Sequence, residues 1–149
     1  MQKDDRIWLV VGDLGFGIFD KIRDDFPERF INTGAAEQAM MGIACGLAME
    51  GKIPFVYSIT SFLLYRPFET IRTYINYEKI NVKLIGSGRN DDYKHDGWSH
   101  DSRDIYSLFD SKGIFCNIID CYPQAKEEIP DLVTKMIKDK NPYFLSLRR

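Results

Sequence analysis

The sequence predicts an α/β protein with three layers, in which a mostly parallel, six-stranded sheet has helices on both faces. Short apolar runs alternate along the chain with segments whose apolar residues recur at helical spacing. The runs are continuous rather than alternating, which is typical of strands that helices cover on both faces. The 149 residues and the 44% hydrophobic content fit a single domain spanning residues 1–149.

Three apolar runs in the first half of the chain fit strands, at residues 7–11, 29–32 and 53–59. A short helix through Phe19 and Ile22 joins the first two strands, and Pro27 ends it. Pro54 lies near the start of the third run, where a missing backbone donor costs least. The first half therefore contributes three strands to the predicted sheet.

A helix of small and apolar residues is predicted from about Ala35 to Glu50, ending at Gly51. Such a helix should be covered by protein on every side. One carboxylate, Glu37, lies in its first turn. Burying an ionised carboxylate is costly, so Glu37 needs a partner or must stay protonated, and a dry acid is suited to proton transfer. The alternative is a helix-start role, in which Gly34 is the N-cap and Glu37 bonds back to its amide.

The second half repeats the alternation. Apolar residues at 64, 68, 71 and 75 predict a second long helix, and the apolar residues between 129 and 137 predict an amphipathic one. A short helix is expected at 105–109, and strands are expected at 82–86, 113–119 and 143–147. The polar stretch 87–101 is a loop of a length that is usually functional or disordered. Ligands of parallel sheets bind beyond the carboxyl ends of the strands, so the loops after the first four strands are the candidates.

Composition excludes several classes of protein. The net charge of −2 gives no reason to expect binding to nucleic acid or to an anionic membrane. The N-terminus lacks the pattern of a signal peptide, and no apolar run approaches a membrane span. Cys45 and Cys116 fall in predicted apolar elements, which favours reduced thiols in the cytoplasm. No metal site is predicted, because the acidic cluster at 90–96 lacks the glycine and final glutamate of a calcium loop.

Five motifs follow one another in a specific order: FINTGAAEQ at 30–38, GLA at 46–48, SFL at 61–63 with Arg66, DGWSH at 96–100, and NPYFLSLR at 141–148. Together they resemble the pyrimidine-binding domain of transketolase-like enzymes, which use thiamine diphosphate. The similarity extends to transketolase and to 1-deoxyxylulose-5-phosphate synthase, and it runs from Leu9 to Arg148.

The resemblance implies cofactor-binding roles for matching positions. Glu37 falls on the catalytic glutamate that contacts N1′ of the aminopyrimidine and favours the tautomer whose nitrogen removes the C2 proton of the thiazolium. Phe62, Tyr65 and Phe68 match aromatics that pack around the pyrimidine ring, although such a trio taken alone is more often part of a hydrophobic core.

Other matches imply substrate contacts. His100 corresponds to a catalytic and substrate-binding histidine near the ketose carbonyl, and Asp96 corresponds to an acidic residue that meets a substrate hydroxyl. Asp13 and Leu14 resemble an Asp-Leu pair near the cofactor. His95 stands where transketolases often have glutamate, so the loop is expected to meet a different substrate.

Two parts of the family pattern are missing. The Gly-Asp-Gly motif with a downstream asparagine, which holds Mg²⁺ and the diphosphate, does not occur; Gly12-Asp13-Leu14 lacks its third glycine. The third, C-terminal domain of the family is also missing from these 149 residues.

We therefore expect the small subunit of a split transketolase-like enzyme that transfers a two-carbon ketol unit between sugar phosphates or activated sugars. A partner subunit would supply the diphosphate-binding domain and Mg²⁺, in an α2β2 heterotetramer with a pyrimidine-domain dimer. Two alternatives remain open. One is a β-subunit-like part of a 2-oxo acid dehydrogenase or a pyruvate-condensing synthase, and the other is a non-catalytic α/β interaction subunit.

Overall fold

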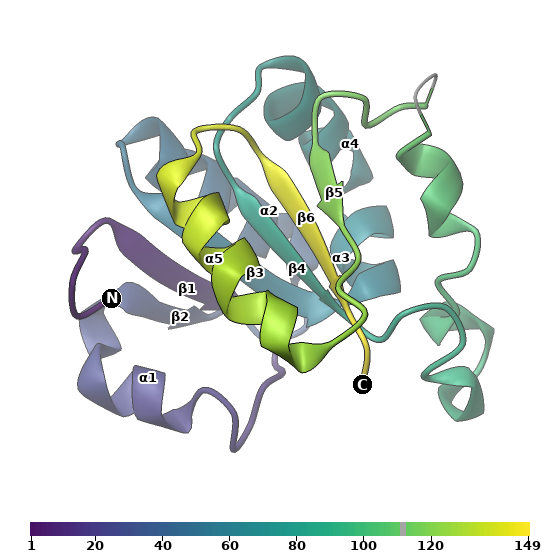
Figure 1. The fold of residues 1–149 in the computed structure, drawn as a ribbon, viewed down its shortest axis with the longest axis horizontal. Coiled ribbons are helices and arrows are strands. Elements are labelled where there is room, and N and C mark those ends of the chain that lie inside the picture. Colours follow the sequence, from purple (N-terminus) through teal and green to yellow (C-terminus); the bar gives the residue numbers. More distant parts are fainter. Residues whose placement is uncertain (111–112) are drawn as a thin grey trace.

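The computed structural model describes residues 1–110 and 113–149 and contains a six-stranded sheet in which every paired strand is parallel (Figure 1). The strand order is β2-β1-β3-β4-β6-β5. The bounds are Ile7–Val11 for β1, Phe30–Asn32 for β2, Ile53–Ile59 for β3, Lys83–Ser87 for β4, Ile119–Cys121 for β5 and Tyr143–Leu147 for β6.

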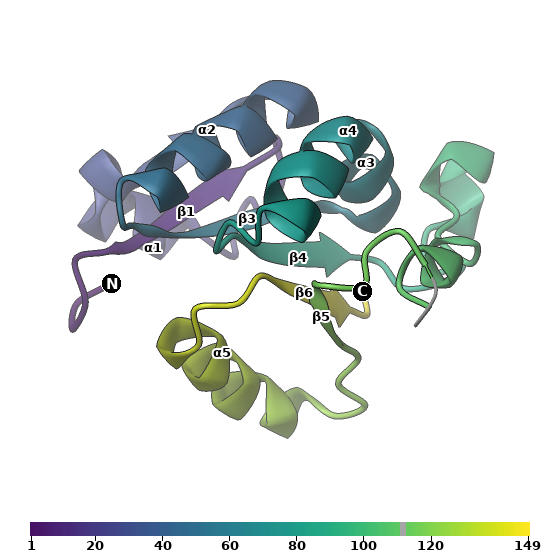
Figure 2. The ribbon, with the colours of Figure 1, turned by 90° about the horizontal axis from the view of Figure 1, so that it is seen from above.

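Helices cover both faces of the sheet, which confirms the three-layer prediction. Figure 2 shows α2 (Glu37–Met49), α3 (Thr60–Tyr65) and α4 (Phe68–Thr70) on one face and α5 (Ile129–Lys138) on the other. Helix α1 (Asp20–Asp25) packs through Ile22 into the same core as α5. A π-helical segment, η2, spans Ile71–Tyr77. Short 3-10 turns complete the chain: η1 (Pro27–Arg29), η3 (Lys94–Asp96), η4 (Trp98–His100), η5 (Ile105–Leu108) and η6 (Lys126–Glu128).

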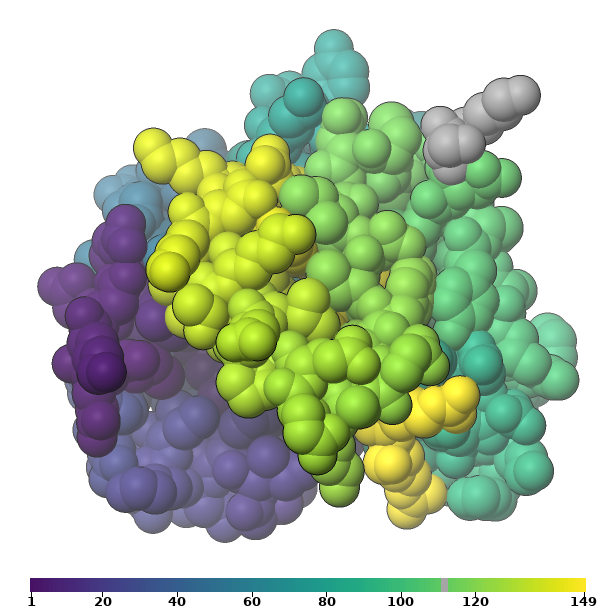
Figure 3. Space-filling model, in the orientation of Figure 1, coloured from purple at the N-terminus to yellow at the C-terminus, as the bar shows by residue number. Residues whose placement is uncertain are grey.

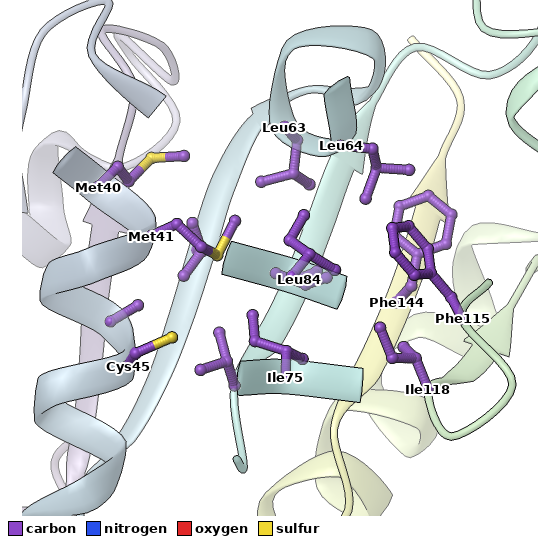
Figure 4. Close-up of a cluster of buried hydrophobic side chains, with 14 of the residues drawn as sticks. Met40, Met41, Cys45, Leu63, Leu64, Ile75, Leu84, Phe115, Ile118 and Phe144 are labelled. Atoms are coloured by element: carbon purple, nitrogen blue, oxygen red, sulfur yellow. The ribbon is translucent and has the colours of Figure 1, made fainter. Parts of the chain in front are cut away.

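Each face of the sheet has its own hydrophobic core. Figure 4 shows the core under α2, where Met40, Met41 and Cys45 point toward β4 and toward Leu63 and Leu64 of α3. The core on the opposite face joins β1, β3 and β6 to α1 and α5. Because side chains on both faces of the sheet are buried, the sequences of the strands are continuous apolar runs.

The prediction for the fifth strand is wrong. The run 113–119 was expected to be a strand, but 114–117 form turns and β5 begins only at Ile119. Phe115 and Ile118 are nevertheless buried, because they insert into the core from this turn segment. Cys116, between them, is exposed rather than part of an apolar strand. Apolar content identified burial here but not backbone conformation.

The long helix predicted around residues 64–75 is interrupted. Its apolar residues do face the core, but the backbone divides into α3, α4 and η2. Pro67 lies between α3 and α4, and proline has no N–H to continue an α-helical ladder.

The composition of helix α2 predicted that protein would cover it on every side, and this prediction is wrong for this chain. One face packs on the sheet, whereas Gln38, Ala39, Gly42, Ile43 and Met49 are exposed in this chain. The helix ends as predicted, because Gly51 adopts a left-handed φ of 78° and its N–H donates to the carbonyl of Ala48.

A buried lysine supports the amino-terminal edge of the sheet. Lys83, the first residue of β4, is fully buried, and its Nζ donates to the carbonyls of Asp139 at 2.9 Å and Asn141 at 2.6 Å. The same Nζ lies 4.8 Å from the ring centre of Tyr143. Burial lowers the pKa of Lys83 from 10.5 to about 8, while the nearby charge of Asp139 acts in the opposite direction.

We expect this lysine to make stability depend on pH. Below pH 8 the Lys83 amine is protonated in both the folded and the unfolded chain. Between about pH 8 and 10.5 the unfolded chain binds more protons than the folded one, so the unfolding free energy should rise with pH. Over this pH range the unfolding free energy should increase by about 3 kcal/mol. Urea unfolding of the wild type and of Lys83→Met, measured from pH 7.5 to 10.5, checks this.

The variant should lack this rise, and Lys140→Met, which removes an exposed lysine, should keep it. Parallel pH profiles for the wild type and Lys83→Met would show that Lys83 does not give up its proton on burial.

Candidate active site

The carboxylate of Glu37 is held at the carboxyl end of β3. Glu37 is the first residue of α2 and is only 2% exposed. Its Oε1 accepts a hydrogen bond of 3.0 Å from Ser58 Oγ, and its Oε2 accepts one of 2.6 Å from Arg66 Nη1. The helix begins at Glu37 itself, after Ala36 as N-cap and without a side-chain cap bond, so the capping alternative is wrong.

A row of stacked groups extends from this carboxylate toward the long loop. The Arg66 guanidinium lies over the ring of Phe62, 3.8 Å from its centre. On the same ring, the imidazole of His100 packs edge-on, with the ring centres 4.8 Å apart. Glu37, Arg66, Phe62 and His100 therefore form one continuous set of contacts.

The loop that carries His100 is held against α3 and β4. Ser61 Oγ donates to the carbonyl of Ser99 at 2.8 Å, and Thr60 Oγ1 donates to the carbonyl of Ser87 at 3.1 Å. A Cβ added to Gly86 would lie 2.5 Å from Thr60 Oγ1, so only glycine allows β4 and α3 to approach this closely. The predicted polar loop is therefore ordered by specific bonds.

The end of β1 lies at the same edge. A Cβ on Gly12 would be 3.1 Å from Ser58 Oγ, which shows how closely β1 approaches the residue that binds Glu37. Beyond Gly12, Asp13 has a φ of 57°, and its N–H donates to Asn32 Oδ1 at 3.2 Å. The exits of β1 and β2 are thereby bonded to one another, and the Gly12 N–H donates to the carbonyl of Tyr57 in β3 at 3.0 Å.

Charged groups anchor the far side of the loop. Buried Arg89 donates to the carbonyl of Ser146 at the end of β6, and its own N–H donates to Asp92 at 2.9 Å. Asp92 also accepts from Arg148 Nη1 at 3.4 Å and from the Arg149 N–H at 3.1 Å. Figure 3 shows the C-terminal residues in yellow beside this segment.

The predicted site residues do not all gather at Glu37. Phe62 contacts the Arg66–His100 row, but Phe68 packs in the core with its ring centre 5.6 Å from that of Phe115. Burial first, and then the nearby carboxylate of Asp104, raise the pKa of Tyr65 to about 12.

The remaining predicted residues lie at the same edge but apart from the row. Asp96 ends the exposed turn η3, four residues before half-buried His100. Asp13 is exposed, whereas Leu14 packs into the core that α1 and α5 share.

The sequence analysis gave no role to the two residues that bind Glu37, although Arg66 belongs to one of the motifs. Ser58 is a polar residue within an otherwise apolar strand, and Arg66 lies four residues after Phe62, the spacing that stacks side chains on a helix. Both signals were available in the sequence, but only the tertiary structure shows that they converge on Glu37.

Residues 1–110 and 113–149 contain no group of three or more His, Cys, Asp or Glu side chains that could hold a metal ion. Within these residues, no helix is long and apolar enough to cross a membrane.

A parallel α/β domain with a buried carboxylate and an adjacent aromatic ring at its carboxyl edge is the architecture of a ligand-binding domain. The family model for the transketolase pyrimidine-binding domain matches residues 1–149. The chain belongs to this family.

Individual relatives agree with this assignment. A putative transketolase C-terminal section from Methanocaldococcus jannaschii is 32% identical over 125 residues, covering 84% of this chain and 39% of the relative. A 6-deoxy-6-sulfo-D-fructose transketolase subunit from a Clostridium species is 36% identical over 108 residues, covering 72% of this chain and 34% of the relative.

A solved structure has the same fold. It is described as a split gene transketolase in an inactive beta4 tetramer, with a TM-score of 0.82 and 31% identity. The match covers 99% of this chain and 47% of that chain. The chain thus spans less than half the length of these relatives.

Removing the Ser58 hydroxyl should destabilise the site. We expect Ser58→Ala to lower the unfolding free energy by about 1–3 kcal/mol, because a buried carboxylate oxygen loses its hydrogen bond. Ser107→Ala removes an exposed hydroxyl and should change it by less than about 0.5 kcal/mol. Chemical denaturation measures both, and equal effects would show that the Ser58–Glu37 bond contributes little.

Proposed function

We propose that this chain is the pyrimidine-binding subunit of a split, thiamine-diphosphate-dependent transketolase-like transferase. The proposed reaction moves a two-carbon ketol unit between sugar phosphates or activated sugars. The observation that carries the proposal is the nearly dry carboxylate of Glu37 at the carboxyl edge of the sheet, beside the Phe62 ring.

The side chains of Glu37 and Phe62 fit an aminopyrimidine. Such a ring is flat, carries N–H and ring nitrogen atoms, and needs one aromatic face and one carboxylate. Glu37 and Phe62 already contact one flat N–H donor, the guanidinium of Arg66, which bonds to one carboxylate oxygen and lies over one face of the ring. The chemistry of these two side chains is therefore compatible with the pyrimidine half of the cofactor.

Each residue has a role in this proposal. When bound, thiamine diphosphate supplies the carbanion chemistry. Glu37 would exchange a proton with N1′ of the pyrimidine, and burial would keep water from competing for it. Phe62 would pack on the ring, while Tyr65 and Phe68 would support α3 and α4 from Asp104 and the core.

The other predicted residues would contact the substrate or the cofactor. His100, fixed by Phe62 and by a 3.1 Å contact between Ser99 Oγ and its Nδ1, would bind the substrate near its carbonyl. Asp96, on the same loop, would accept from a substrate hydroxyl. Asp13 and Leu14 would line the cofactor at the exit of β1.

The remaining parts of the site would come from a second chain. We propose that a diphosphate-binding subunit provides Mg²⁺ and the diphosphate contacts, in an α2β2 heterotetramer in the cytoplasm. The exposed apolar face of α2, with its glycines at 42 and 46, would meet a second pyrimidine domain. One relative is named as a transketolase subunit and another as a split gene transketolase, which supports a two-chain enzyme.

A test of this function uses the complex purified from its native cells. We expect Glu37→Gln to lower kcat by at least about a hundredfold, because the amide cannot exchange the proton. Glu69→Gln changes an exposed carboxylate in α4 and should leave kcat near the wild-type value.

Substrate comparison separates the alternatives. Turnover of a ketose phosphate supports the proposal. Turnover of pyruvate alone would instead favour the alternative hypothesis of a 2-oxo acid dehydrogenase or a pyruvate-condensing synthase. Full activity of Glu37→Gln would identify this chain as a non-catalytic interaction subunit.

A further inference from the structure

Arg66 is the one residue of the Glu37–Arg66–Phe62–His100 row that has no role in the reaction proposed above. It contacts both the buried carboxylate and the aromatic ring, at 2.6 Å and 3.8 Å respectively. We propose that Arg66 is a positioning residue: it fixes the direction of the Glu37 side chain while the aminopyrimidine is bound. This inference rests on the proposed function.

The position of Arg66 is fixed from three directions. It follows Tyr65 at the end of α3, where its N–H donates to the carbonyl of Phe62 at 3.3 Å. The four-residue separation places its side chain over the Phe62 ring, where a guanidinium is attracted to the π face. A third contact is the ion pair with Glu37. A planar cation held this way aims its N–H at one carboxylate oxygen.

The carboxylate keeps capacity for a further partner. Ser58 occupies one acceptor position on Oε1 and Arg66 occupies one on Oε2, whereas the two oxygens together offer about four. Arg66 is 43% exposed in its side chain and Glu37 is 2% exposed, so the cation lies on the open side of the buried group. The carboxylate can therefore accept from the arginine and meet N1′ of the pyrimidine at the same time.

Arg66 acts on proton transfer by orienting Glu37. The 2.6 Å bond from its Nη1 to Oε2 fixes the direction from which the Glu37 carboxyl group would share a proton with N1′. The proton moves within this pair, and no other group gains or loses one. In this proposal the effect of Arg66 on the reaction passes through Glu37.

The experiment compares Arg66→Met, Arg66→Lys and the wild type in the native complex loaded with thiamine diphosphate and Mg²⁺. Two quantities are measured: the Kd of thiamine diphosphate, and the rate at which the bound cofactor exchanges its C2 proton for deuterium, followed by NMR after acid quench. The exchange rate reports on the proton relay without substrate or turnover.

We expect Arg66→Met to slow the exchange by at least about tenfold, and to change the Kd by less than about threefold. Arg66→Lys restores a positive charge and should recover most of the exchange rate. Arg23→Met removes an arginine of similar exposure that pairs with exposed carboxylates on α1, and it should leave both quantities unchanged. Thermal unfolding shows whether each variant is folded.

Two results would overturn the inference about Arg66 alone. One is wild-type exchange in Arg66→Met. The other is cofactor binding at least about threefold tighter in that variant, which would mean that the guanidinium occupies the pyrimidine's place and must leave. If the wild-type complex binds no thiamine diphosphate, or if Glu37→Gln exchanges normally, the proposed function fails as well.

Discussion

The buried carboxylate of Glu37 is the constraint to which the neighbouring parts of the structure are adapted. At 2% exposure it requires partners, and two elements supply them: Ser58 from β3 and Arg66 from the end of α3. The first turn of α2 must therefore lie beside the exit of β3, and Arg66 must reach back over Phe62. One electrostatic requirement thus links three elements that are separate in the sequence.

The sheet topology makes this convergence possible. In the order β2-β1-β3-β4-β6-β5, the central strands β1, β3 and β4 are neighbours, so their carboxyl ends and following segments share one edge. Gly12 and Gly86 permit the close approaches at this edge, against Ser58 and Thr60 respectively. The opposite edge carries buried Lys83, which ties the turn before β6 to β4. The edge with converging side chains is the one suited to a ligand.

Much of the fold could be predicted because burial on both faces produces continuous apolar runs. The predicted bounds of β3 and β6 agree with the structure, and β1 does so as well. The fifth strand could not be located, because Phe115 and Ile118 are as apolar in a turn as they would be in a strand. The interruption of the helix at Pro67 was visible in the sequence, but its π-helical continuation was not.

By itself, the sequence determined the α/β class, the alternation of elements and the presence of a carboxylate in the first turn of an apolar helix. These properties depend on local patterns of apolar residues and on single residue types. Only the tertiary structure decided that Glu37 pairs with Arg66 and Ser58, that Phe62 joins His100 while Phe68 enters the core, and that one face of α2 is open. The two bonds to Glu37 join residues 21 and 29 positions apart, and no periodicity along the chain encodes which side chains meet.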